Sequence, residues 1–291
     1  MLVFNTNQCR DVKDWFQWYA RQWNVPCIGV HTPRAIGEVD DALVEYVARQ
    51  MAALVEPLEQ VSGTRLDIDR LREVIELSRQ CTLLWKQVLE AATNVPSPIT
   101  FFDGTIQMGP AVVLRGSQDA INYYRLLVDE LRQRIAQWVA AVEGEKLRIY
   151  WEGMPVWGKL RDLSTQFLAL RTCVVASTYC NSWIFDDLDG SDPFRSMARA
   201  YSSIFIARSD DYKEQYIRQM AEKYRIHGIL YHDAKTCPNN SNSRYEMPLR
   251  LRERLGLPFL VIHGDLNDLR LYSEEQARTN IEAFAEQLMQ A

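Results

Sequence analysis

Apolar positions in the first half of the chain repeat at three- and four-residue steps, which is the spacing of amphipathic helices. The repeat is clear just after the N-terminus, at Val12, Trp15, Phe16, Tyr19 and Trp23. Similar repeats predict long helices over residues 38–60, 67–92 and 117–142. Two short apolar runs, over residues 2–7 and 26–33, predict strands on either side of the first helix.

From about Leu147 the pattern changes to short apolar runs, each followed by a helical repeat. The runs are LRIYWEG, TCVVAS, GILYHDAK and PFLVIHGD. Strands that alternate with helices form a parallel sheet covered on both faces. We therefore predict an α/β protein with two Rossmann-like parallel-sheet domains linked by long helices. The first spans residues 1–146 and the second, doubly wound, spans residues 147–291.

The first of these domains is predicted to be incomplete. Residues 1–33 carry only two strands, which are too few for a stable sheet. We therefore expect either a missing N-terminal portion or a partner that supplies strands.

Composition narrows the class of protein. The 291 residues are 47% hydrophobic and 24% charged with a net charge of −5, which is typical of a globular protein with sizeable cores. No basic block indicates nucleic acid, and no apolar run is long enough to span a membrane. The first residues, MLVFNTNQCRD, do not resemble a secretory signal. With six cysteines in a chain of this length, we expect a reducing, cytoplasmic location rather than a disulfide scaffold.

Three cysteines are predicted to lie just beyond the carboxyl ends of strands, where open parallel sheets bind their ligands. Cys9 follows LVFNTN, Cys180 follows TCVVASTY and Cys237 follows GILYHDAK. Cys9 and Cys237 are the stronger candidates for ligands, and Cys180 is the weaker one. A turn thiol without a ligand role is the alternative for each.

The other cysteines are predicted to be buried structural side chains. Cys27 lies inside a strand, Cys81 on the apolar stripe of a helix and Cys173 at the start of a strand. The close cysteine pairs typical of zinc sites are absent, as is the regular ferredoxin spacing. A cluster held by scattered strand-end cysteines stays open.

Two other features of the sequence are candidate sites. The segment GMPVWGKL matches the start of a phosphate-binding loop, but Leu160 stands where Ser or Thr would hold Mg²⁺, and Pro155 has no amide to donate. A plain turn is the better interpretation. His31, His232 and His263 lie near strand ends, and each is either an acid–base group of a site or an ordinary core or turn histidine.

Five segments in order resemble the benzoyl-CoA reductase / 2-hydroxyacyl-CoA dehydratase family over essentially the whole chain. They are NTNQCRDVKDWFQWYARQWNVPCIGVHTP, RIYWEGMPVW, HDAKTCPNNSN, GLPFLVIHGDLND and TNIEAF. The resemblance implies an iron–sulfur subunit that works beside a homologous sister subunit. Each such subunit holds a [4Fe-4S] cluster through three cysteines.

Two of those three cysteines have matches here. The family's N-x-C turn matches Cys9, and its K-x-C turn matches Cys237. The remaining cysteine belongs to an additional N-terminal segment and has no match. Lys235, Asn239 and His232 are candidates to surround the cluster. Asn280 is a further departure, since relatives often carry Arg there.

The resemblance also implies a function in anaerobic aromatic degradation or a related acyl-CoA pathway. A separate ATP-hydrolysing iron–sulfur activator supplies a low-potential electron, and an acyl-CoA thioester accepts it as a ketyl radical. Benzoyl-CoA reductase, which dearomatises a ring, is the first hypothesis, and a 2-hydroxyacyl-CoA dehydratase is the second. A third is a cluster-free structural partner that completes another subunit's active site. Individual catalytic residues are not assigned.

Overall fold

The computed structural model describes the chain except for residues 8–9, 238–240, 244–245 and 291. Its larger sheet has four strands, all parallel, in the order β4-β3-β5-β6. They are β3 (Leu147–Glu152), β4 (Thr172–Ser177), β5 (Gly228–Ala234) and β6 (Phe259–Gly264). Every residue of β3, β4 and β5 is buried, as expected for strands covered on both faces, whereas β6 is a partly exposed edge.

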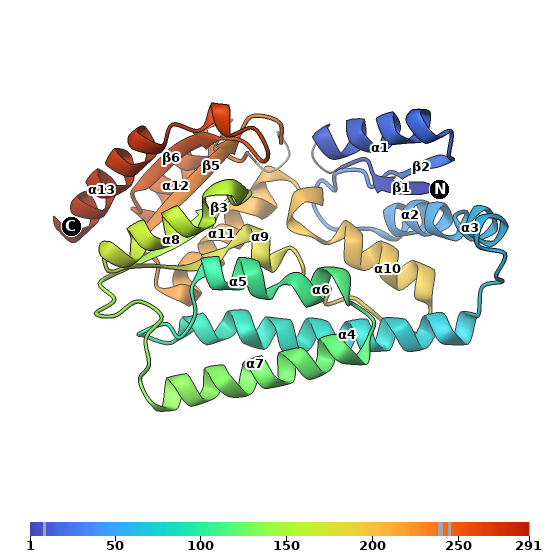
Figure 1. Ribbon diagram of the computed structural model, residues 1–291, viewed down its shortest axis with the longest axis horizontal. Helices are drawn as coiled ribbons and strands as arrows, with labels where there is room; N and C mark the ends of the chain where they lie inside the picture. Colours follow the sequence, from blue (N-terminus) through green and yellow to red (C-terminus); the bar gives the residue numbers. More distant parts are fainter. Residues whose placement is uncertain (8–9, 238–240, 244–245, 291) are drawn as a thin grey trace.

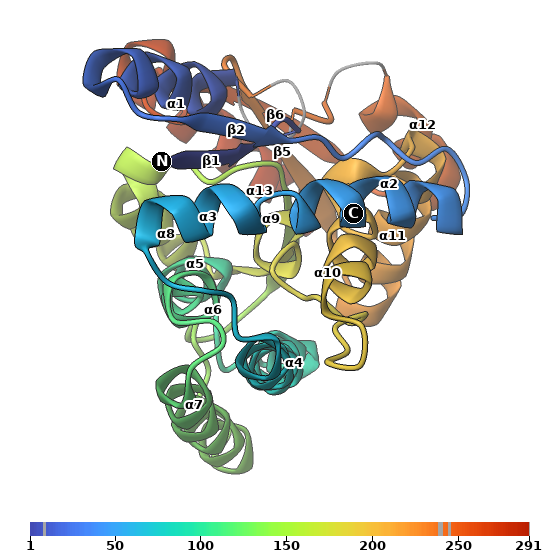
Figure 2. The ribbon, with the colours of Figure 1, turned by 90° about the vertical axis from the view of Figure 1, so that its right-hand side faces the viewer.

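Helices cover both faces of this sheet, as the sequence predicts. α8 (Leu160–Ala169) lies on one face, and α11 (Asp210–Tyr224) and α12 (Met247–Leu255) lie on the other. With right-handed crossovers this follows from the strand order, because the connection from β3 to β4 runs toward one edge of the sheet and the connections from β4 to β5 and from β5 to β6 run toward the other edge. α13 (Glu274–Gln290) returns to the face of α8. There the Gln166 amide donates to the carbonyl of Arg278. Figure 2 shows α8 and α11 on opposite sides of the molecule.

The N-terminal part forms a smaller parallel sheet of two strands, β1 (Leu2–Asn5) and β2 (Cys27–Val30). It is accompanied by α1 (Arg10–Trp23), α2 (Asp41–Ala52) and α3 (Val55–Ser62). α10 (Pro193–Ser202), from the second half of the chain, packs against α2 (Figure 1). Their shared core holds Val30, Val44, Val47, Ala48 and Ala198.

One predicted helix is in fact two. The apolar repeat predicts a single helix over residues 38–60, but the chain breaks at Ala53 and Leu54 between α2 and α3. Pro57 explains the break, because it has no amide to donate to the carbonyl of residue 53 and its ring would clash with that carbonyl. The prediction of one continuous helix was therefore wrong.

Two long helices, α4 (Ile68–Glu90) and α7 (Gln118–Ala136), lie side by side beneath the rest of the molecule (Figures 1 and 2). Trp85 and Tyr124 join them, with ring centroids 5.4 Å apart. The short helices α5 (Phe101–Gln107), α6 (Gly109–Val113) and α9 (Thr178–Asn181) lie between this pair and the sheet. The two long helices thus reach the sheet through these short helices, with which they share one core.

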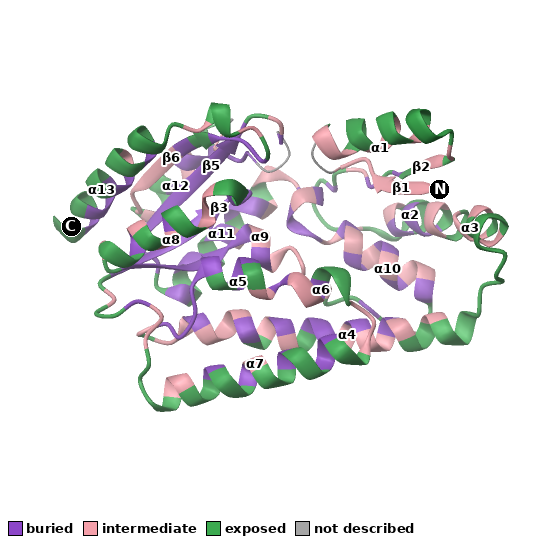
Figure 3. Cartoon of the chain, in the orientation of Figure 1, coloured by how far each residue is buried: buried purple, intermediate pink, exposed green. Residues whose placement is uncertain are grey.

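One main core unites the sheet with these helices, and Figure 3 shows buried residues on both. It contains residues from before and after the predicted boundary, such as Trp85, Tyr124, Ile149 and Val174. The α/β class with parallel sheets is thus confirmed, while the division into domains at residue 147 stays a prediction. Among the described residues, every helix is too short or too polar to cross a membrane.

Candidate functional site at the strand ends

The candidate site lies at the carboxyl ends of β3 and β5, which are neighbours in the sheet. The chain leaves β3 toward α8 on one face and leaves β5 toward α12 on the other. Such a switch point opens a crevice in which α/β proteins bind ligands. Glu152 ends β3 here, and the segment with Cys237 follows β5.

Glu152 accepts hydrogen bonds on both carboxylate oxygens. The Asn242 amide donates to one oxygen at 2.6 Å, and the Thr178 hydroxyl donates to the other. Thr178 in turn accepts from the hydroxyl of Tyr150 at 2.5 Å. All four side chains are buried, so a polar chain runs through the end of an otherwise apolar sheet.

A buried ammonium group completes this chain of contacts. Lys213 Nζ of α11 donates to Asn242 Oδ1 at 2.9 Å. Burial raises the pKa of Glu152 to about 7, and the bonds from Thr178 and Asn242 act in the opposite direction. Burial likewise lowers the pKa of Lys213. The Asn242 side chain therefore links a carboxylate to an ammonium group, with a donor toward the first and an acceptor toward the second.

Cys237 is fully buried in a small cluster with Met154, Ala234 and Leu266. Its carbonyl accepts a hydrogen bond from the Ser241 hydroxyl at 2.9 Å, and the same hydroxyl reaches the carbonyl of Ala234 at 2.8 Å. These bonds tie the segment that follows Cys237 back to the end of β5.

The residue before Cys237 is held from the other side of β5. Asp265, after β6, accepts from the amide and the hydroxyl of Thr236 at 3.0 and 2.5 Å. Burial alone would raise the pKa of Asp265, but hydrogen bonds from Thr236, Leu266 and Asp268 lower it overall. The ionised carboxylate of Asp265 thus holds Thr236, the residue directly before Cys237, in place.

The side chains predicted to surround a cluster differ in their settings. His232 is fully buried, and its Nδ1 donates to the carbonyl of Met154 at 2.6 Å. Its Nε2 is buried without a hydrogen-bond partner among the described residues. Lys235 is partly exposed and pairs with Asp233 at 3.0 Å, close to His263 at 3.5 Å. Asn239 lies outside the described residues.

Cys9 also lies outside the described residues, but the chain just after it approaches the Cys237 cluster. Val12 of α1 packs against that cluster. Asp11 accepts a hydrogen bond from Asn267, after β6, at 3.3 Å. Figure 1 shows the N-terminal end of α1 facing the carboxyl ends of β5 and β6.

The remaining cysteines are placed elsewhere. Cys81, Cys173 and Cys180 are buried in the main core, and Cys27 is half-buried beside the carbonyl of Phe16. Burial raises the pKa of Cys180 to about 11, and its sulfur lies 3.9 Å from the Thr105 hydroxyl. Across the described ranges, no three His, Cys, Asp or Glu side chains are close enough together to hold a metal ion.

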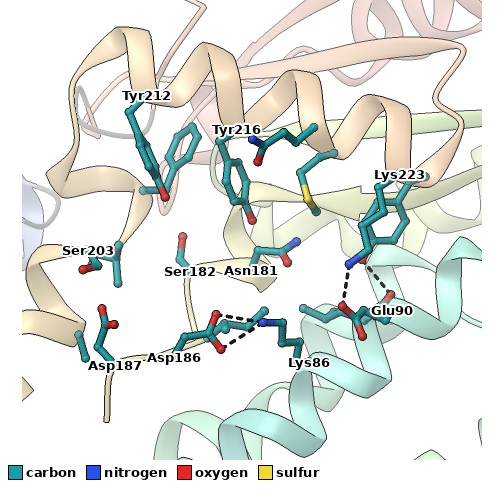
Figure 4. Close-up of a pocket in the computed structure, with 18 residues that line it drawn as sticks. Lys86, Glu90, Asn181, Ser182, Asp186, Asp187, Ser203, Tyr212, Tyr216 and Lys223 are labelled. Carbon is teal, nitrogen blue, oxygen red and sulfur yellow. Dashed lines mark hydrogen bonds and ion pairs between the residues drawn. The ribbon is translucent and has the colours of Figure 1, made fainter. Parts of the chain in front are cut away.

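A separate cavity of about 470 Å³ opens between α4, α10 and α11. Figure 4 shows its two lysines turned toward carboxylates. Lys86 lies 3.0 Å from Asp186, and Lys223 lies 2.7 Å from Glu90. Both lysines are thus paired with carboxylates. Tyr212 and Tyr216 lie on α11 together with Lys223 and face Lys86 and Asp186 across the cavity. Nothing in the sequence indicated this cavity.

The sequence also did not indicate Glu152, Thr178, Lys213 or Asn242. One signal was available for Glu152, because β3 ends on an acidic residue whereas its neighbours β4 and β5 end on Ser177 and Ala234. Lys213 looks like an ordinary helix-surface lysine, and only the packing of α11 buries it.

Comparisons with known proteins agree with the resemblance. A family model described as "2-hydroxyglutaryl-CoA dehydratase, D-component" matches residues 1–288. A benzoyl-CoA reductase subunit of Thauera aromatica is 30% identical over 300 residues, which cover 98% of this chain and 69% of that protein. The (R)-2-hydroxyisocaproyl-CoA dehydratase alpha subunit of Clostridioides difficile is 29% identical over 292 residues, covering 98% of this chain and 70% of that protein.

A third relative is more distant. The alpha subunit of (R)-2-hydroxyglutaryl-CoA dehydratase from Acidaminococcus fermentans is 25% identical over 284 residues, covering 96% of this chain and 58% of that protein. All three are subunits of the two enzyme classes that the sequence predicted, and that prediction is confirmed. The chain belongs to the 2-hydroxyglutaryl-CoA dehydratase D-component family.

Proposed function

We propose that this chain is an iron–sulfur subunit of an ATP-driven, low-potential acyl-CoA reductase. Benzoyl-CoA reductase is the first candidate, since the Thauera aromatica subunit of that enzyme is 30% identical over 98% of this chain. A 2-hydroxyacyl-CoA dehydratase is the alternative, with a relative at 29% identity over the same share. The narrow difference between these values leaves both substrates to be tested.

The observation that carries the proposal is the position of Cys237. It is a buried thiol at the switch point of a parallel sheet, and Asp11 and Val12 bring the segment after Cys9 toward it. Soft thiolates are the ligands that iron–sulfur clusters use, and an apolar surround suits a low-potential site. Cys9 and Cys237 would hold a [4Fe-4S] cluster, with a further ligand from outside the described residues.

When bound, such a cluster would supply one-electron chemistry and a Lewis-acidic iron. The described residues of this chain orient and shield that site. His232 is held through Nδ1 by the carbonyl of Met154, which leaves its Nε2 as a buried acceptor. Lys235, beside Asp233, carries a positive charge at the mouth of the same crevice. We propose these two residues, with Asn239, as the surroundings of the cluster.

The proposal includes partners. The relatives are named as subunits, which supports a homologous sister subunit for this chain. An ATP-hydrolysing activator is proposed as the electron donor. In support, Lys159 of the GMPVWGKL turn is held by Glu274 at 2.6 Å and Asp162 at 3.2 Å, rather than being available to a phosphate.

The first experiment measures iron and acid-labile sulfide in the anaerobically purified chain with its sister subunit. Cys237→Ser and Cys9→Ser should each remove most of the iron, because an alcohol is a poor replacement for a soft thiolate ligand. Cys27→Ser is the matched control and should keep the iron, since Cys27 lies at the start of β2, beside the carbonyl of Phe16 of α1. Circular dichroism should remain close to that of the unchanged protein.

Three results separate the candidates. Full iron content in both Cys237→Ser and Cys9→Ser would refute the proposed ligands. An iron-free wild-type complex that still activates its sister subunit would favour the cluster-free structural partner. With iron present, turnover of benzoyl-CoA against a 2-hydroxyacyl-CoA, in the presence of the activator, decides between reductase and dehydratase.

A further inference from the structure

The segment with Cys237 is fastened by two buried carboxylates from the strands on either side of β5. Asp265, after β6, holds Thr236 before the cysteine. Glu152, at the end of β3, holds Asn242 after it. Between them, Ser241 donates to the carbonyl of Cys237 itself. Because Ser241 precedes Asn242 in the chain, a movement of Asn242 would reach Cys237 through the hydrogen bond of Ser241.

Only one orientation of the Asn242 side chain satisfies its neighbours. Its amide nitrogen faces Glu152 at 2.6 Å, and its oxygen faces Lys213 at 2.9 Å. If the amide were flipped, its oxygen would face the Glu152 carboxylate and its NH₂ group would face the Lys213 ammonium group. Both hydrogen bonds would then be lost, and two buried charged groups would lose a partner. The carboxylate and the ammonium group thus determine where the segment after Cys237 is anchored.

A carboxylate is costly to place in a core, and a purely apolar contact would anchor the sheet end at least as well. Both oxygens of Glu152 are used by uncharged donors, Thr178 and Asn242. Thr178 belongs to the start of α9, so the carboxylate joins that turn to the Cys237 segment across the crevice. This arrangement orients a segment rather than adding packing.

We infer that Glu152 is a positioning residue, which sets the geometry of the Cys237 segment through Asn242 and Lys213. The importance of that geometry for a cluster rests on the proposed function, whereas the anchoring itself does not. The hydrogen bonds of Glu152 go to Thr178 and Asn242, so its effect on Cys237 is indirect.

The test exchanges donor and acceptor in the Glu152–Asn242 hydrogen bond, in the chain of residues 1–291 prepared without a cluster. Asn242→Asp keeps the size of the side chain but turns a donor against the Glu152 carboxylate into an acceptor. Glu152→Gln combined with Asn242→Asp restores the bond in reverse, because the new amide nitrogen can donate to residue 242 while its oxygen still accepts from Thr178. The new carboxylate then lies beside Lys213.

The readout is the rate at which iodoacetamide alkylates Cys237, followed by mass spectrometry of the peptide. Asn242→Asp should raise this rate by at least about tenfold, as expected when a charge-assisted hydrogen bond that closes a segment is lost. The double variant should return to within about threefold of the unchanged protein. Alkylation of Cys81, fully buried in the main core, reports global opening and should not change.

Two further variants keep the result interpretable. Asn122→Asp, on the exposed surface of α7, is the matched control for an added charge and should leave Cys237 unreactive. Asn242→Ala removes the bridge without adding a charge, and it replaces Asn242→Asp if that variant does not fold. Unchanged alkylation of Cys237 in the single variants, or no rescue in the double variant, would overturn the inference.

Iron content of the same variants, purified anaerobically with the sister subunit, separates the inference from the proposed function. If the alkylation pattern holds and the wild type binds no iron, the anchoring role stands and the ligand role of Cys237 fails. If Cys237→Ser loses iron but the anchoring variants behave like wild type in both assays, the ligand role stands and the inference fails.

Discussion

At the scale of single residues, Glu152 shows how burial changes an ordinary side chain. It follows Trp151 on a strand whose other residues are buried, and its hydrogen-bond donors are uncharged. Hydrogen bonds from Thr178 and Asn242 compensate part of its lost hydration, yet its pKa remains raised to about 7. Protonation near neutral pH is therefore part of the energetics of the fold.

This residue carries a prediction about pH. Because the pKa of Glu152 is higher in the folded protein than its ordinary value of 4.5, the folded state binds this proton more tightly than the unfolded state. The resulting stabilisation is present at low pH and is lost as the pH rises through about 7. The free energy of unfolding of the wild type, relative to Glu152→Gln, should fall by up to about 3 kcal/mol between about pH 5 and pH 8.

Urea unfolding of both proteins at a series of pH values measures this difference. The comparison removes contributions shared by both proteins, including those of His227 and His232, whose pKa values are lowered by burial. Asp265 has a lowered pKa and is ionised throughout this pH range. A difference that stays constant across it would contradict the raised pKa of Glu152.

At the scale of elements, the pairing of β5 with β6 depends on a small residue at the site. A methyl group on Gly264 would lie 2.8 Å from His232 Nε2 and 3.3 Å from the Tyr272 ring. Gly264 lies opposite Ala234 in the ladder, so the end of β6 approaches the fully buried imidazole closely. Steric space, rather than backbone conformation, explains glycine here.

Gly264→Ala should lower the free energy of unfolding by about 1–3 kcal/mol, as overpacking of a buried position does. Gly104→Ala is the matched control, since its new methyl group would meet Cys180 Sγ and Leu89 only at 3.6 and 3.9 Å. That control should be neutral or slightly stabilising in a helix. Chemical unfolding provides both values.

A double-mutant cycle identifies the clash. The cost of Gly264→Ala should shrink when His232→Ala has already removed the imidazole. An equal cost in both backgrounds would show that the ring of His232 is not the group that requires glycine.

At the scale of the whole molecule, the two halves of the chain complete each other. Phe101 stacks on Trp151 with ring centroids 5.1 Å apart. Arg148 of β3 is buried, and its guanidinium donates to the carbonyl of Ala92 at 2.5 Å and to Glu145 at 2.5 Å. The larger sheet therefore depends on residues that precede it for both apolar cover and charge compensation.

A fragment of residues 147–291 should consequently fail to unfold cooperatively. Removal of residues 1–146 would leave the guanidinium of Arg148 without Glu145 and Ala92, and would uncover Trp151. Both effects are destabilising, because Arg148 loses its ion pair with Glu145 and the apolar ring of Trp151 becomes exposed to water. Near-ultraviolet circular dichroism and calorimetry, with the full chain as control, measure the outcome. A sharp transition of the isolated fragment would support residue 147 as a true domain boundary.

Much of the fold could be predicted because its signals are local. The four apolar runs after Leu147 match β3 to β6, and the helical repeats before it match α1, α4 and α7. Such periods follow from the geometry of the backbone, which repeats every two residues in a strand and every 3.6 in a helix. Where a local signal competed with the repeat, at Pro57, the prediction of one helix was wrong.

For the candidate site too, some features follow from local sequence and others depend on the tertiary structure. The sequence by itself determined the order of the strands along the chain, the position of Cys237 just after β5, and the family to which the chain belongs. The tertiary structure decided which side chains meet there. Asn242 reaches Glu152 across 90 residues of sequence, and Asn267 reaches Asp11 across 256. No local pattern encodes such pairs, because they depend on strand order, on the hand of the crossovers, and on which helix buries a lysine such as Lys213.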